Sequence, residues 1–196
     1  MIKAVLFDFD GVIHNTFDRV FAINQQIKPS ITVEEYLGYL DGNIYANMNI
    51  TKEKSTMFAK LQNETFLGMM IKQEIKEELI QLQQKHSLFI VSSASETFLK
   101  RYCQDNKLDF FQEVLGQDTH RSKEVKFNWL MEKYGLKKEE CIFVTDTLGD
   151  LKEANNVGIK SIAVDFGYHN RERLEMGNPL SIVSEFSEIR QIVDKL

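Results

Sequence analysis

The apolar residues of this chain fall into short runs that stop abruptly at polar side chains. Four runs stand out, at residues 4–7, 88–91, 141–144 and 161–164, and weaker ones lie at 112–115 and 181–183. Continuous apolar runs of this length are typical of parallel strands that are covered on both faces. The pattern therefore predicts a buried parallel sheet.

Helical patterns separate these strand runs. Apolar residues recur at helical spacing around Phe98, Phe127 and Leu151, and the last two stripes end at Gly135 and Gly158. Strands that alternate with helices form right-handed βαβ units. The sequence thus predicts an α/β fold with a doubly wound, Rossmann-like parallel sheet.

The interval between the first two strand runs has a different character, because residues 14–84 hold no convincing strand pattern. Helical stripes lie at 17–24, 33–40 and 71–82, and Thr32 with Glu35 resembles a capping box. The segment is too long for a simple crossover. We therefore predict an all-helical cap domain at 14–84, inserted into an α/β core formed by 1–13 and 85–196.

Charge and composition narrow the possible partners. The 196 residues carry 24 basic and 29 acidic side chains, a formal charge of −5, so nucleic acid is a poor candidate partner. No apolar run approaches the roughly 18 residues of a membrane helix. The two cysteines, Cys103 and Cys141, form neither a disulfide framework nor a CxxC metal pair. We expect a cytoplasmic protein with reduced thiols and no membrane partner.

Three of the strand runs end in an oxygen-bearing side chain. The first is followed by Asp8, the second by Ser92 and the third by Thr145 and Asp146. In open α/β sheets the ligand binds at the carboxyl ends of the strands. We therefore expect these side chains to converge on one site.

The carboxylates at these strand ends favour a hard cation. Asp8 and Asp10 lie on one side of an extended backbone, where they repel each other unless a cation such as Mg²⁺ lies between them. Gly11 allows a sharp turn that brings backbone N–H groups near an anion. Asp146 supplies a third carboxylate, whereas Asp150 opens the next helix, where an acid is also a common cap.

The remaining candidates are groups that suit a phosphate. Ser92 and Ser93 precede a helix, where hydroxyl and N–H groups bind anions or simply cap the helix. Lys123 lies at the start of the helix around Phe127 and could hold a phosphoryl oxygen beside the three carboxylates. Lys126 is the alternative lysine.

Taken together, these segments resemble the haloacid dehalogenase superfamily. Its pattern is a strand ending in DxDG[TV], a strand ending in Ser or Thr, a lysine, and a strand leading to DxxxD. The chain carries these in order, as residues 8–12, Ser92, Lys123 and residues 146–150. The helical insert matches the family's cap between the first and second motifs. The resemblance is to the subgroup of phosphoglycolate phosphatases and β-phosphoglucomutases.

The resemblance implies a role for each carboxylate. Asp8 would be the nucleophile that forms an aspartyl-phosphate. Asp10 would be the general acid for the leaving alcohol and then the base for water. Asp8, the backbone carbonyl of Asp10, and Asp146 would hold Mg²⁺, with Asp150 as a further or outer group of the metal site.

The same resemblance assigns the phosphate-binding groups. Ser92 and Lys123 would bind the transferring phosphoryl oxygens and take part in catalysis, with Gly11 and Ser93 nearby. Two departures from the family pattern concern this part of the site. Many relatives have Lys-Pro where this chain has Lys123-Glu124, and many have Asn at the position of Ser93.

The resulting expectation is a Mg²⁺-dependent phosphatase acting on a small phosphorylated metabolite, as a monomer or a homodimer. Relatives that are mutases carry a histidine at the position of Val20, which argues against that activity, although His14 is a candidate substitute. A phosphomutase or phosphotransferase of the same superfamily remains an alternative, and so does a non-turnover phospho-acceptor or binding module. His169 follows the fourth strand run and could border the site. No cap residue identifies the substrate.

Overall fold

The computed structural model describes all 196 residues, and its core is one parallel sheet. The strand order is β3-β2-β1-β4-β5-β6. The strands are β1 (Ala4–Phe7), β2 (Ser87–Val91), β3 (Phe111–Leu115), β4 (Cys141–Thr145), β5 (Lys160–Val164) and β6 (Ser181–Val183). The predicted α/β class and doubly wound sheet are confirmed, and the two weaker runs form the edge strands.

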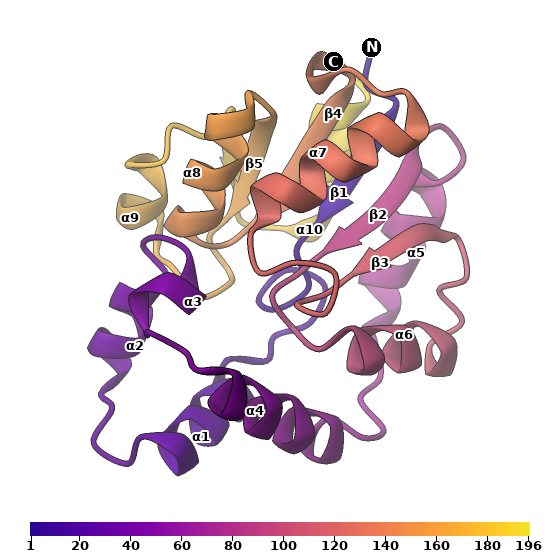
Figure 1. The fold of residues 1–196 in the computed structure, drawn as a ribbon. Helices are drawn as coiled ribbons and strands as arrows, with labels where there is room; N and C mark the ends of the chain where they lie inside the picture. The colour runs from indigo at the N-terminus through magenta and orange to yellow at the C-terminus, as the bar shows by residue number, and fades with distance from the viewer.

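Helices cover both faces of the sheet (Figure 1). Ala4 and Leu6 of β1 pack with α7 (Lys123–Tyr134) and α8 (Leu148–Val157). Val5 and Phe7, which point the other way, pack with α6 (Glu96–Asp105) and α10 (Phe186–Val193). Alternate residues of a strand point to opposite faces, so a strand between two helical layers must be apolar throughout. A short 3-10 turn (Lys138–Glu140) and α9 (Arg171–Glu175) complete this part of the chain.

Four helices follow β1 and gather at one end of the sheet, in indigo and purple in Figure 1. They are α1 (Phe17–Ile27), α2 (Val33–Tyr39), α3 (Ile44–Asn47) and α4 (Lys52–Thr65). The hydroxyl of Thr32 accepts a hydrogen bond from the Glu35 N–H at 3.1 Å and caps α2 as expected. Helix α4 has no predicted counterpart, because Met57, Phe58 and Leu61 are its only large apolar residues.

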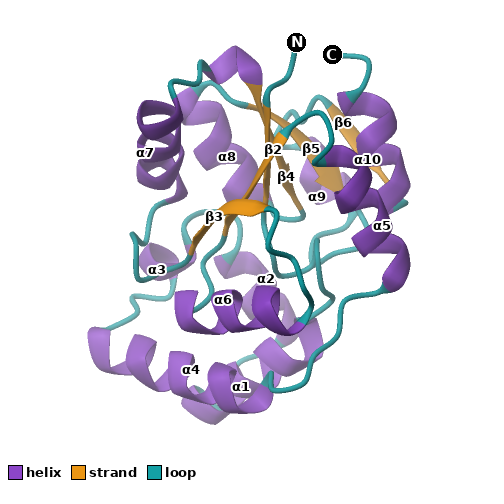
Figure 2. Cartoon of the chain, turned by 90° about the vertical axis from the view of Figure 1, so that its right-hand side faces the viewer, coloured by secondary structure: helices purple, strands orange, loops and turns teal.

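The last helix of the predicted cap segment, α5 (Gln73–Leu82), lies beside α10 (Figure 2). Leu79 and Leu82 belong to the main apolar core, and Glu78 pairs with Arg190 of α10 at 2.6 Å. This packing favours assigning α5 to the layer that covers the sheet. The domain limits 1–13, 14–84 and 85–196 therefore stay a prediction, and α5 is the part that the packing argues against.

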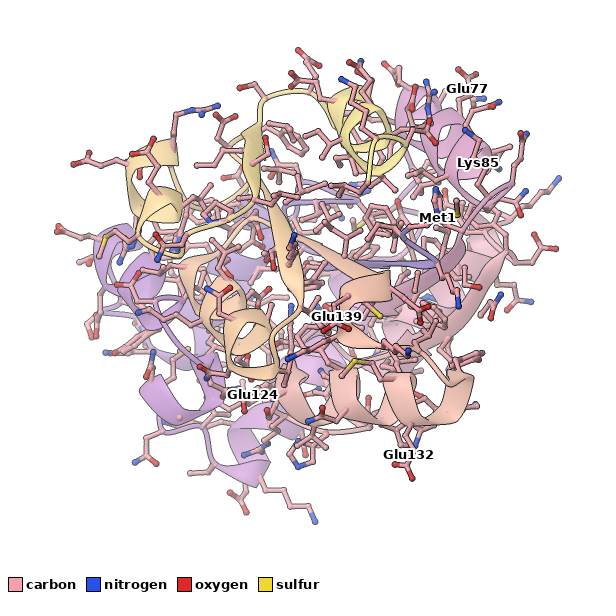
Figure 3. The ribbon with its side chains drawn as sticks, turned by 90° about the horizontal axis from the view of Figure 1, so that it is seen from above. Met1, Glu77, Lys85, Glu124, Glu132 and Glu139 are labelled. Atoms are coloured by element: carbon pink, nitrogen blue, oxygen red, sulfur yellow. The ribbon has the colours of Figure 1, made fainter.

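The outer surface of the molecule is rich in charged side chains. Figure 3 shows Glu77 of α5 and Glu132 of α7 directed away from the body of the protein. No helix is both long enough and apolar enough to cross a bilayer.

Candidate active site

The predicted site residues meet above the central strands of the sheet. Asp8 follows β1, and the neighbouring strands β2 and β4 lead into Ser92 and Asp146. The strand order reverses between β1 and β4, which is where open α/β sheets bind ligands. A cavity of about 300 Å³ lies there. All the predicted site residues except Gly11 line it, namely Asp8, Asp10, Ser92, Ser93, Lys123, Asp146 and Asp150.

Lys123 joins two of the carboxylates. It is the first residue of α7 and is buried, with its Nζ 2.9 Å from Oδ2 of Asp8 and 2.5 Å from Oδ2 of Asp150. Burial by itself would lower the pKa of the Lys123 ammonium, but the two carboxylates outweigh it and raise the pKa. A permanent positive charge therefore lies beside the predicted nucleophile.

The pKa values of Asp8 and Asp150 shift in opposite directions, although both side chains contact this lysine. Burial raises the pKa of Asp8 well above its ordinary value, and the attraction of Lys123 does not reverse that. Burial acts on Asp150 in the same direction, but Lys123 and the hydrogen bonds that Asp150 accepts hold its pKa below the ordinary value. One of these bonds comes from the Thr145 hydroxyl at 2.7 Å. Asp150 is therefore the firmly ionised partner of Lys123.

Asp146 has one oxygen without a partner. Its Oδ2 accepts a hydrogen bond from the Tyr168 N–H at 2.7 Å, whereas its Oδ1 is buried and makes no hydrogen bond. Burial raises the pKa of Asp146 to about 8. Gly11 packs against it with φ near 75°, and a Cβ at residue 11 would lie 1.8 Å from Oδ2. Only glycine fits this close approach.

These features fit a divalent cation. Asp8 and Asp146 are buried with raised pKa values, and a cation would satisfy the free Oδ1 of Asp146. The structure contains no ready-made group of three His, Cys, Asp or Glu ligands. Mg²⁺ commonly takes one or two carboxylates and completes its shell with water and substrate phosphate oxygens. Asp8 and Asp146 could hold it in that way, with the carbonyl of Asp10, while Asp150 is committed to Lys123 and Thr145.

Asp10 is held by Thr16, which Tyr168 supports in turn, and the sequence pattern had marked neither as a site residue. Its Oδ1 accepts a hydrogen bond from the Thr16 hydroxyl at 2.5 Å, and the Thr16 oxygen lies 2.9 Å from the Tyr168 hydroxyl. Since the Thr16 proton points to Asp10, Tyr168 donates to Thr16. Burial raises the pKa of Asp10 to about 6. A carboxyl with a pKa near the working pH is suited to give and take protons.

Lys126, the alternative lysine, contacts backbone carbonyl oxygens, whereas Lys123 contacts carboxylates. Lys126 is fully buried, and its Nζ donates to the carbonyl oxygens of Ser92 at 2.6 Å and Gly116 at 3.3 Å. Burial, and then the charge of Lys123, lower its pKa to about 7. The structure thus places Lys123 against the carboxylates and Lys126 under the loop that follows β2.

The cap lies directly on the site. The Tyr45 hydroxyl donates to the carbonyl of Ser93 at 2.6 Å, and the N–H of Gly149 donates to the carbonyl of Leu40 at 2.8 Å. A Cβ at residue 149 would lie 2.3 Å from the carbonyl oxygen of Gly42, so the cap approaches α8 where only glycine fits. The cap therefore forms the roof of the cavity.

The two histidines considered from the sequence do not line this cavity. His169 accepts a hydrogen bond from the Leu148 N–H at Nδ1, and its Nε2 lies 3.0 Å from the carbonyl oxygen of Leu37 in the cap. His14 lies 3.1 Å from the Tyr102 hydroxyl. His169 therefore connects cap and core.

Comparison with known proteins agrees with this geometry. Residues 5–164 match the family model of haloacid dehalogenase-like hydrolases. The chain belongs to the haloacid dehalogenase-like hydrolase family. It is 25% identical to a phosphoglycolate phosphatase of Vibrio parahaemolyticus, over 98% of this chain and 96% of the relative.

Solved structures share the fold of this hydrolase. A predicted phosphatase from Clostridium acetobutylicum superposes with a TM-score of 0.80 at 20% identity, over 100% of both chains. A putative β-phosphoglucomutase from Thermotoga maritima gives 0.71 at 15% identity, again over 100% of both chains. The predicted family and the prediction of a hydrolase are confirmed, while the roles of the individual site residues remain predictions.

Proposed function

We propose that this hydrolase is a Mg²⁺-dependent phosphatase that removes phosphate from a small metabolite through an aspartyl-phosphate intermediate. The observation that carries the proposal is the position of Asp8, which lies against the buried ammonium of Lys123 and lines one cavity with Asp10. The names of relatives, among them the phosphoglycolate phosphatase of Vibrio parahaemolyticus, support a phosphate monoester as the substrate.

In the first half of the reaction, a carboxylate oxygen of Asp8 attacks phosphorus. A bond forms between Asp8 and phosphorus while the bond from phosphorus to the leaving oxygen breaks. Asp10 donates its proton to that oxygen, so the product leaves as an alcohol. Lys123 and Ser92 bind the non-bridging oxygens, and their fixed positions lower the cost of the charge that develops there.

In the second half, water attacks the phosphorus of the aspartyl-phosphate. Asp10, now ionised, takes a proton from this water, and the bond between Asp8 and phosphorus breaks to release inorganic phosphate. Thr16 holds the carboxyl group of Asp10 in place in both steps. When bound between Asp8 and Asp146, Mg²⁺ would supply further positive charge to the phosphoryl oxygens.

The direct test is release of inorganic phosphate from a panel of phosphorylated metabolites, with Mg²⁺ and with the metal removed by EDTA. We expect turnover in Mg²⁺ and its loss in EDTA, with recovery when Mg²⁺ is added back. Transfer of the phosphate to a second hydroxyl without free phosphate would point to a phosphotransferase. A stable phosphoprotein without turnover would point to a phospho-acceptor module.

The loss of rate caused by Asp10→Asn is expected to depend on the leaving group of the substrate. For an alkyl phosphate, the loss of the proton donor should reduce kcat by about 10²–10⁴-fold. For p-nitrophenyl phosphate, whose leaving group needs no proton, formation of the aspartyl-phosphate should be nearly as fast as in the wild type. A rapid burst of p-nitrophenol followed by slow release of phosphate is the expected record. If Asp10→Asn slowed the formation of the aspartyl-phosphate equally with both substrates, this role of Asp10 would be contradicted.

A further inference from the structure

The cap side of the cavity surrounds the part of the substrate that leaves. The segment from α1 to α4 contributes a mostly apolar wall there, and its aliphatic and phenyl members are Val20, Ile27, Leu40, Ile44, Met48, Ile50 and Phe58. The cavity holds about 300 Å³, the lower end of the range for ligands of drug size. A two-carbon leaving group would leave most of this wall without contacts.

The cap offers no buried free cation to this space. No arginine lines the cavity, and the cap supplies two lysines, Lys28 and Lys54. Lys28 forms an ion pair with Glu35 and a hydrogen bond with the Tyr39 hydroxyl, so its charge is already compensated. Lys54 is exposed in the first turn of α4, where water screens its charge.

Acidic side chains make the space still less suitable for a carboxylate. Glu153 lines the cavity together with the four aspartates of the site. Lys123 compensates Asp8 and Asp150, and a cation between Asp8 and Asp146 would be shared with the phosphate. A second negative charge on the leaving group would therefore be buried without a partner, which is costly.

Neutral polar groups of three buried residues do face the cavity. The hydroxyl of Tyr36 has no hydrogen-bond partner in the protein, although the residue is only 2% exposed. Gln62 uses its carbonyl to accept from the Ser95 N–H at 2.9 Å, which leaves its amide N–H groups free. Asn24 uses its amide nitrogen on the carbonyl of Val20 at 2.9 Å, which leaves its oxygen free.

Water in the cavity can reach these free groups, and a ligand that displaces the water without replacing its hydrogen bonds binds more weakly. We propose that the substrate of this enzyme has an uncharged leaving group, with an apolar face for the cap wall and hydroxyl or amide groups for Tyr36, Gln62 and Asn24. A nucleoside 5′-monophosphate has this chemistry, whereas 2-phosphoglycolate has the opposite one. The inference rests on the proposed phosphatase function and departs from the substrate named for the Vibrio parahaemolyticus relative.

The test compares two sets of phosphate monoesters by kcat/KM. The uncharged set is uridine 5′-monophosphate, adenosine 5′-monophosphate and ribose 5-phosphate, and the carboxylate set is 2-phosphoglycolate and 3-phosphoglycerate. We expect the best uncharged substrate to exceed the best carboxylate substrate by at least about tenfold, which is roughly the value of one buried interaction. Equal values, or a preference for the carboxylates, would overturn the inference.

Two variants test the cause of the preference. Tyr36→Phe removes only the unpartnered hydroxyl and should raise KM for the preferred uncharged substrate about fivefold. Met48→Lys places a cation in the wall and should raise kcat/KM for 2-phosphoglycolate about tenfold. Met57→Lys is the matched control, because Met57 is 47% exposed on the cap and does not line the cavity. If Met48→Lys and Met57→Lys have the same effect, the charge argument is wrong.

Binding separates this inference from the proposed function. Calorimetry with the Asp8→Asn variant and Mg²⁺ measures affinity for uridine 5′-monophosphate and 2-phosphoglycolate without chemistry. Tighter binding of the nucleotide would support the inference even if no substrate turned over. Turnover of p-nitrophenyl phosphate together with tighter binding of 2-phosphoglycolate would reject the inference and keep the phosphatase.

Discussion

Asp8→Asn is expected to reduce phosphate release by at least about 10⁴-fold, because an amide cannot attack phosphorus and form the acyl phosphate. The substitution is nearly isosteric. The Asn oxygen can still accept the hydrogen bond from the Phe9 N–H, which is 2.7 Å from Oδ1 of Asp8. Lys123 keeps its bond to Asp150 at 2.5 Å. We therefore expect a folded protein, and steady-state phosphate release in saturating Mg²⁺ is the measurement.

The control for Asp8→Asn is the same substitution elsewhere. Asp105 lies exposed at the end of α6, and Asp105→Asn should leave turnover unchanged. Trapping of the intermediate offers a second measurement. Acid-quenched protein should carry phosphate on Asp8 in the wild type and none in Asp8→Asn. Unchanged turnover in Asp8→Asn would show that the proposed mechanism is wrong.

Lys123→Met is expected to have the second largest effect, on stability and on activity together. Its removal leaves Asp8 and Asp150 buried without their cation, which should lower the free energy of unfolding by about 3 kcal/mol. Loss of a charge aimed at the phosphoryl oxygens should reduce kcat/KM by about 10²–10³-fold. Denaturant unfolding and phosphate release under folding conditions measure the two effects separately.

Lys126→Met is the matched comparison, on the same helix and equally buried. The Lys126 ammonium donates hydrogen bonds to the carbonyl oxygens of Ser92 and Gly116 and to no carboxylate. Its loss removes hydrogen bonds of about 1 kcal/mol each and should reduce kcat/KM only about fivefold. A larger loss of activity in Lys126→Met than in Lys123→Met would assign the phosphate-binding role to Lys126.

The ends of the strands were predictable because their cause is local. The run at 4–7 is apolar throughout and is followed by Asp8, since β1 is covered by helices on both faces and ends at the ligand edge. The same reasoning placed Ser92 after β2 and Asp146 after β4. The C-terminal ends of α7 and α8 were also predictable. Gly135 and Gly158 adopt left-handed backbone conformations there, which terminate the two helices.

The helices of the insert were harder to predict. Helix α4 has few large apolar residues because Phe58 and Leu61 alone pack against the main core, while polar residues of the same helix line the cavity. Helix α5 has a clear apolar stripe, but a stripe does not say which surface it covers. Its packing against α10 depends on contacts between residues far apart in the chain, such as Glu78 and Arg190.

The amino-acid sequence alone determined the sheet, the family and the convergence of carboxylates at the strand ends, because periodicity and strand-end chemistry are local properties. Only the tertiary structure separated the positions of the two lysines, because Lys123 lies against Asp8 and Asp150 whereas Lys126 lies against backbone carbonyl oxygens. Residues three apart lie on the same face of a helix, so their spacing cannot separate them. The structure also brought Thr16 and Tyr168 to Asp10 and left the hydroxyl of Tyr36 free in the cavity. These contacts depend on how the cap sits on the core, and no local pattern carries that information.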